Sequence, residues 1–133
     1  MAAAVVAMAL LGACAGMGGL SADTPANVKQ EAVSARAKAR WDKLIAGDLA
    51  GAYTYLSPAS RATMSLDVYK AKHKVGMYRS VKIDNVECKA DTCTVTLHLT
   101  YDYRRNRRTN SITTPLTESW IISEGQAWIV DRG

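Results

Sequence analysis

The residue of this sequence best suited to acid–base chemistry is Glu118. Apolar and polar side chains alternate around it, and Glu118 shares the even-numbered phase of Leu116 and Trp120. Such alternation predicts a strand with one face turned toward the protein interior, which places the carboxylate on that inner face. Burying a carboxylate is costly unless it is paired. Glu118 is therefore expected to act as a general base in a pocket or, more commonly, to pair with an Arg or Tyr or lie at the pocket rim.

The two histidines of the chain carry no catalytic signature. His73 is expected at the end of a short helix, and His98 on the outer face of a strand. No motif supplies either of them with a serine or cysteine nucleophile. Two histidines without a second cysteine pair also fall short of the usual set of metal ligands. We expect no metal and no cofactor, and the sequence favours a non-catalytic protein over an enzyme.

The N-terminus carries a different chemistry, centred on Cys14. Residues 2–11 form an apolar run too short and too rich in alanine for a membrane span, which favours a signal peptide. The run ends in Leu11-Gly12-Ala13-Cys14, which resembles the lipobox of bacterial lipoproteins, where the cysteine receives the lipid. Residues 1–14 are thus expected to be a signal peptide with Cys14 as the lipidation site. One feature departs from the pattern, because no Lys or Arg precedes the run. The alternative is an ordinary cleaved signal peptide in which Cys14 is incidental.

Cys88 and Cys93 are expected to form a disulfide bond. Apart from Cys14 they are the only cysteines of the chain, and exported proteins usually contain an even number. The four residues between them suit a hairpin loop with the cysteines facing each other. On the chain-entropy model, closing a ring of about six residues contributes about 2 kcal/mol. The bond would therefore fix the register of two strands rather than create the fold.

The strongest charge feature is the run Arg104-Arg105-Asn106-Arg107-Arg108. It stands between two predicted strands and is expected to form a long exposed hairpin loop. Guanidinium groups bind carboxylates and phosphates through paired N–H donors. The four arginines are therefore candidates for contact with an acidic protein or with anionic lipid head groups, and a merely solvated loop is the alternative. Nucleic acid is not expected as a partner, because an exported protein rarely meets it.

The first half of the chain, which must position these residues, reads as helices. Residues 15–24 are small and polar and predict a flexible tether. Apolar side chains at helical spacing predict helices over residues 25–46, 49–56 and 65–74. The segment 57–61 is interpreted as the end of a helix, because the residue before Pro58 avoids helical backbone angles.

The second half changes to a period of two. It predicts strands over residues 78–88, 93–103, 112–123 and 126–131. Within the first strand the apolar phase reverses between Ile83 and Val86. With the two cysteines paired, an extra residue at Asp84-Asn85 is needed to keep both halves on one face, so we predict a β-bulge there. The side chains expected to face the helices are Leu116, Trp120, Ile122, Trp128 and Val130.

Helices followed by four antiparallel strands indicate an α+β fold with helices on one face of a sheet. Three segments then carry a family resemblance: Trp41 to Tyr55, Leu56-Ser57-Pro58, and the final hairpin from Trp120 to Val130. Through them the chain resembles the nuclear-transport-factor-2-like (SnoaL-like, cystatin-like) superfamily over residues 25–131. The resemblance implies that residues 25–133 form one domain, a curved four-stranded sheet wrapped around N-terminal helices as a cone with a pocket. A first strand that many members place between the second and third helices is not evident here.

The resemblance implies no single activity, because members include isomerases, dehydratases, polyketide cyclases, secretion-system scaffolds and non-catalytic proteins. We expect an envelope lipoprotein whose domain binds a protein partner or a small ligand. The alternative is a small isomerase-, dehydratase- or cyclase-type enzyme with Glu118 as general base. A lipid on Cys14 would hold the protein on the periplasmic side of a membrane, and the absence of Asp after it favours the outer membrane. The net charge of +5 weakly favours anionic partners, and a homodimer stays open.

Overall fold

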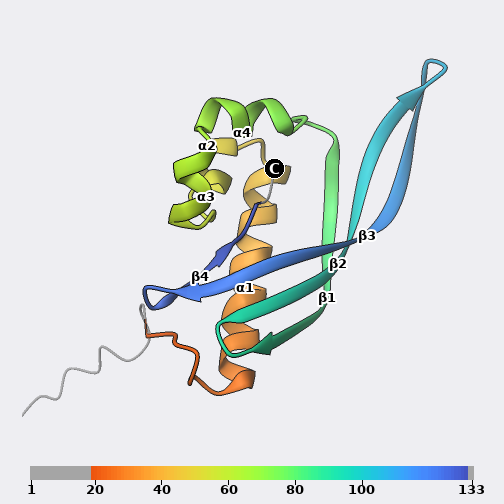
Figure 1. Ribbon diagram of the computed structural model, residues 1–133. Helices are drawn as coiled ribbons and strands as arrows, with labels where there is room; N and C mark the ends of the chain where they lie inside the picture. The colour runs from red at the N-terminus through yellow and green to blue at the C-terminus, as the bar shows by residue number, and fades with distance from the viewer. Residues whose placement is uncertain (1–18, 132–133) are drawn as a thin grey trace, which may run out of the picture.

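The computed structural model describes residues 19–131, and within them four helices precede four strands (Figure 1). The helices are α1 (Ala26–Ile45), α2 (Leu49–Tyr53), α3 (Pro58–Thr63) and α4 (Leu66–Lys72). The strands are β1 (Tyr78–Lys89), β2 (Thr92–Arg105), β3 (Arg108–Ser123) and β4 (Gln126–Ile129). The predicted α+β class with a four-stranded antiparallel sheet is confirmed. The predicted signal peptide and Cys14 lie outside the described residues, and no helix inside them has the length and apolarity to cross a membrane.

Local sequence signals set the helix boundaries. Asp48 begins α2 by accepting a hydrogen bond from the backbone N–H of Gly51 at 2.9 Å. Ser65 begins α4 in the same way, accepting from Val68 at 3.3 Å. Gly47 lies just beyond α1 with a φ of +79°, a conformation that glycine adopts without strain.

The segment around Pro58 differs from the prediction, because it begins α3, whereas α2 already ends at Tyr53. The hydroxyl oxygen of Ser57 accepts a hydrogen bond from the backbone N–H of Ser60 at 3.1 Å. Pro58 then occupies the first helical position, where a missing N–H leaves no bond unmade. The Ser-Pro pair therefore separates α2 from α3 and caps the second of them.

The sheet has the strand order β1-β2-β3-β4, and all neighbours are antiparallel. The predicted β-bulge is confirmed. The β1–β2 register shifts between Ile83 and Asn85, which leaves Asp84 as the extra residue of the ladder. Because of this extra residue, Ile83 and Val86 face the same side of the sheet despite their odd spacing.

Cys88 faces Cys93 across the β1–β2 hairpin, and their sulfur atoms are bonded. The predicted disulfide is confirmed in the structure. The loop between the strands is shorter than predicted, because Lys89 pairs with Thr92 and the turn has two residues. Ala90, the first of them, has a φ of +52°.

The β2–β3 hairpin is longer than predicted. The ladder continues to the pair Arg105–Arg108, so that Asn106 and Arg107 alone form the turn. Both have positive φ, 53° and 62°, as a two-residue type I′ turn requires. The prediction of a long loop over Arg104–Arg108 is therefore wrong, since the strands pair through the arginines. In Figure 1 the hairpin extends far beyond the helices, and its tip lies at the opposite end of the molecule from residue 19.

The inner face of β4 also differs from the prediction. Ala127 and Ile129 are buried, whereas Trp128 and Val130 are half-buried. The reason is the two-residue turn between β3 and β4, which pairs Ile122 with Ala127. Paired residues share a face of the sheet, so an even-numbered inner residue of β3 has an odd-numbered inner partner on β4.

One apolar cluster joins the helices to the strands. From α1 it includes Val33, Ala37, Trp41 and Leu44, and from the strands Val95, Leu97, Trp120 and Ile122. α1 contacts β1, β2 and β4. The outer edge of β4 is covered in part, because Leu56 forms an isolated parallel bridge with Ile129. This cluster fixes α1 relative to β3, the two elements that carry the first candidate site.

Candidate functional site

The carboxylate of Glu118 is surrounded by three N–H donors. Its Oε2 accepts hydrogen bonds from Nη1 of Arg40 at 2.9 Å and from Nε1 of Trp41 at 3.0 Å. Its Oε1 accepts from Nε1 of Trp120 at 3.2 Å. The side chains of Arg40 and Glu118 are only 6% and 9% exposed, so the ion pair is buried. Of the alternatives for Glu118, the structure shows a buried carboxylate paired with an arginine.

Two elements bring this group together. Arg40 and Trp41 are consecutive residues of α1, and Glu118 and Trp120 stand two apart on the inner face of β3. Because side chains two apart on a strand point to the same face, the indole of Trp120 lies beside the carboxylate. The sequence indicated the inner position of Glu118, but it gave no signal that Arg40, on a helix face rich in charge, would be its partner.

A ring of aromatic groups continues from Arg40. Nη2 of Arg40 lies 3.4 Å from the hydroxyl of Tyr69. The ring centroids of Tyr69 and His73 are 4.4 Å apart. Nδ1 of His73 in turn lies 3.2 Å from the hydroxyl of Tyr78. Burial raises the pKa of both tyrosines, against the opposing charge of Arg40. Burial also lowers the pKa of His73, and the charge of Arg40 acts in the same direction.

The ion pair and hydrogen bonds of Glu118 limit the chemistry that this site can perform. A shallow polar depression of about 300 Å³ lies over Arg40 and Glu118, and Asp131 contributes to its wall. A general base needs a free lone pair directed at its substrate. Both oxygens of Glu118 instead accept hydrogen bonds, two on Oε2 from Arg40 and Trp41 and one on Oε1 from Trp120. The arrangement suits a structural role better than acid–base catalysis.

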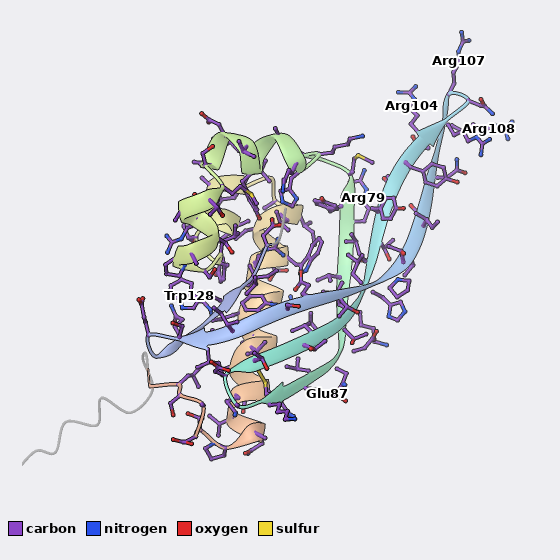
Figure 2. The ribbon with its side chains drawn as sticks, viewed as in Figure 1. Arg79, Glu87, Arg104, Arg107, Arg108 and Trp128 are labelled. Carbon is purple, nitrogen blue, oxygen red and sulfur yellow. A yellow bond between two sulfur atoms is a disulfide. The ribbon has the colours of Figure 1, made fainter. Side chains whose placement is uncertain are left out.

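The arginines of the β2–β3 hairpin lie apart from this site. Arg104, Arg105, Arg107 and Arg108 are all exposed, and the three labelled in Figure 2 stand at the far end of the hairpin. None of the four forms a salt bridge with another described residue. The structure thus brings them together at a single tip.

The nearest acidic side chain on the hairpin is already occupied. The Asp102 carboxylate accepts hydrogen bonds from the hydroxyl of Ser111 and from Nε of Arg79, both at 2.5 Å. The Ser111 bond, followed by that of Arg79, lowers the pKa of the Asp102 carboxyl. Beside the arginines, Tyr103 and Ile112 are 38% and 42% exposed. The hairpin therefore offers positive charge next to apolar surface.

Sequence reasoning missed a third group, which is centred on Trp128 at the surface. The guanidinium carbon of Arg36 lies 5.3 Å from the Trp128 ring centroid and 4.6 Å from that of Tyr55. The guanidinium carbon of Arg61 lies 5.6 Å from the Trp128 centroid. Nε1 of Trp128 donates to the backbone oxygen of Ser123 at 3.0 Å, which holds the ring in place. The predicted inward position of Trp128 concealed this cluster, and even the correct strand phase identifies none of its arginine partners.

The remaining predicted residues lie as follows. His98 is exposed on the outer face of β2, as predicted, and its Nδ1 pairs with the Asp84 carboxylate at the bulge. No group of three or more metal-ligating side chains occurs within residues 19–131. The last part of the predicted tether contacts the domain: the N–H of Leu20 donates to the Gly125 carbonyl, and Lys29 donates to the Ala22 carbonyl.

Comparison with known proteins gives a fold likeness without a family. No protein-family model matches the chain, and no curated protein sequence matches it. The chain is similar in structure to a SEC-C motif containing protein from Rhodopseudomonas palustris, determined in solution, with a TM-score of 0.58. The two are 14% identical, and the match covers 73% of each chain. At this identity the likeness concerns the fold alone.

Proposed function

We propose that the protein is an exported envelope lipoprotein, anchored through Cys14, whose domain binds an acidic protein partner without catalysis. The observation that carries this proposal is the hairpin tip, where four exposed arginines have no ion pair within residues 19–131. Arginine and exposed aromatic side chains are enriched in protein interfaces. The tip combines them, since Tyr103 lies on the same strand face as Arg105.

The position of the tip favours a protein over the lipid head groups of the anchoring membrane. From Cys14 to Gly19 the chain spans at most about 18 Å when fully extended. A lipid on Cys14 would therefore hold residue 19 close to the membrane surface. Because the hairpin tip lies at the opposite end of the molecule from residue 19, it would point away from that membrane (Figure 1).

An enzyme is the less favoured function because of the Arg40–Glu118 pair. Glu118 already accepts three N–H hydrogen bonds within this buried pair, which favours a structural role for its carboxylate. The domain itself we assign to the nuclear-transport-factor-2-like superfamily, with the sheet curved around α1 as a cone. A long first helix, a bulged β1 and an apolar cluster shared by α1 and the sheet support this assignment.

The lipid anchor predicts a defined mass. Protein extracted from native membranes is expected to begin at Cys14 and to carry the additional mass of a diacylglyceryl group. The Cys14→Ser variant is expected to lack that mass and to leave the membrane fraction, because serine offers no thiol for the lipid. Intact-mass spectrometry measures both, with Ala15→Ser as the matched control that keeps the thiol. An unlipidated chain cut at another residue would overturn the anchor.

The hairpin contact predicts a loss of partner recovery. Replacing all four tip arginines by serine is expected to reduce recovery of the partner in a crosslinking pulldown about tenfold or more, because interface arginines often dominate binding. The matched control removes four exposed positive charges elsewhere by replacing Lys70, Lys72, Lys74 and Lys82 with serine. Equal recovery by the two variants would show that net charge, and not the tip, determines binding.

A further inference from the structure

A groove of about 450 Å³ lies between the first half of α1 and the turn that joins β3 to β4. Val28, Ala32 and Arg36 line it from α1, four residues apart, so they share one helix face. Leu20 lines the opposite side, held there by a 3.0 Å hydrogen bond from its N–H to the Gly125 carbonyl. The volume lies within the range of small-molecule sites.

The groove has an apolar part and one charge. Leu20, Val28 and Ala32 present hydrocarbon, and Thr24 and Gln126 add neutral polar groups. Arg36 is the one charged side chain among the described residues that line it. A ligand that fills the groove therefore meets hydrocarbon along its length and a guanidinium at one place.

Arg36 is fixed in position, and it has no anionic partner among residues 19–131. Its Nε donates to the Ala127 carbonyl at 2.6 Å, and its guanidinium lies over the Tyr55 ring. No carboxylate within residues 19–131 pairs with it, and burial lowers its pKa. The cationic surroundings extend further, because Arg61 shares the Trp128 ring and its buried Nε has no hydrogen-bond partner among the described residues. A half-buried guanidinium whose counter-charge is missing from the described residues favours an anion from outside.

We propose that this groove binds a small molecule with an unbranched alkyl chain and a terminal carboxylate. The alkyl chain lies against Leu20, Val28 and Ala32, and the carboxylate accepts hydrogen bonds from the terminal nitrogens of Arg36. The planar fork of a guanidinium matches the two oxygens of a carboxylate. The inference depends on neither the lipid anchor nor the hairpin tip.

The test uses octanoate as the probe and the full chain carrying Cys14→Ser, which removes the predicted acyl acceptor. Titration followed by ¹⁵N–¹H correlation spectra is expected to shift the amide signals of Ala32 and Gln126 in a saturable way. Affinity is expected to rise about fourfold per methylene from butanoate to octanoate, as for burial of hydrocarbon. Octan-1-ol is expected to bind about tenfold more weakly than octanoate, because it lacks the charge-assisted hydrogen bonds to Arg36.

Two variants locate the site. Arg36→Gln is expected to weaken octanoate binding about tenfold or more while leaving octan-1-ol binding unchanged. Ala32→Phe fills the groove and is expected to abolish binding of both probes. Arg107→Gln removes the same charge at the hairpin tip and serves as the control with unchanged binding. The octanoate–octanol comparison needs no variant, so it decides the role of charge even if Arg36→Gln fails to fold.

Three results would overturn the proposal. The first is the absence of saturable shifts with octanoate in the otherwise unaltered chain. The second is equal affinity for octanoate and octan-1-ol, which would remove Arg36 from recognition. The third is unchanged octanoate binding in a folded Ala32→Phe chain, which would place the probe outside the groove, for example on the apolar residues 2–11.

Discussion

Replacement of Glu118 by alanine is expected to lower the free energy of unfolding by about 3–5 kcal/mol, the usual cost of removing one partner of a buried ion pair. The change would leave the Arg40 guanidinium buried without a counter-charge, because both side chains are less than one tenth exposed. It would also leave the indole N–H groups of Trp41 and Trp120 without their acceptor. Urea unfolding followed by circular dichroism measures the effect.

Two controls separate this effect from a general loss of charge. Lys38 and Asp42 form an exposed i,i+4 pair, with side chains 64% and 59% exposed, and Lys38→Ala is expected to cost less than about 1 kcal/mol. The double variant Arg40→Met with Glu118→Leu is expected to recover the part of the loss that is due to the unpaired charge, because no buried charge then remains at this site, while the indole N–H groups of Trp41 and Trp120 still lack their acceptor. A loss below about 1 kcal/mol for Glu118→Ala would show that the pair is not structural and would restore Glu118 as a candidate base.

The second large effect is a contrast between two tryptophans. Trp120→Ala is expected to cost about 3–5 kcal/mol, since the side chain is 1% exposed within the core. Trp128→Ala is expected to cost about 1–2 kcal/mol, because it removes two guanidinium–ring contacts at the surface. The expectation from sequence, with both rings turned inward, would make the two losses alike.

The measurement is again urea unfolding of the two variants beside the unaltered chain. Octanoate affinity provides a second readout. Trp128→Ala removes a ring that contacts Arg36, and Arg36 lines the groove. Losses of equal size for Trp120→Ala and Trp128→Ala would contradict the strand phase described for β4.

The sequence predicts the parts of this fold that depend on local pattern. Helical spacing and the residues before each helix are local signals, so α1, α2 and α4 were expected close to where they lie. The bulge was also predictable, because the apolar phase of β1 reverses between Ile83 and Val86 while the Cys88–Cys93 pair fixes the register. A single ladder can satisfy both conditions only with one extra residue.

The predictions that were wrong concern features set by turn geometry and by contacts between residues far apart in the sequence. The predicted inner face of β4 was wrong because the two-residue turn pairs even-numbered positions of β3 with odd-numbered positions of β4. The prediction of a long loop at the arginines was wrong because Asn106 permits a tight turn. The charged residues beside this turn then pair with each other as part of β2 and β3. Neither the Arg40–Glu118 pair nor the cluster at Trp128 has a sequence signature, because Glu118 is 78 positions from Arg40 and Trp128 is at least 67 positions from both of its arginines.

The turn of the β2–β3 hairpin has a backbone conformation that lowers the folding stability of the tip. Asn106 and Arg107 both have positive φ, and the second position of such a turn is where glycine is preferred. An arginine there is held in a left-handed conformation at a cost of about 1 kcal/mol relative to glycine. Position 107 is thus conformationally suboptimal, and the same residue supplies one of the four exposed positive charges of the tip.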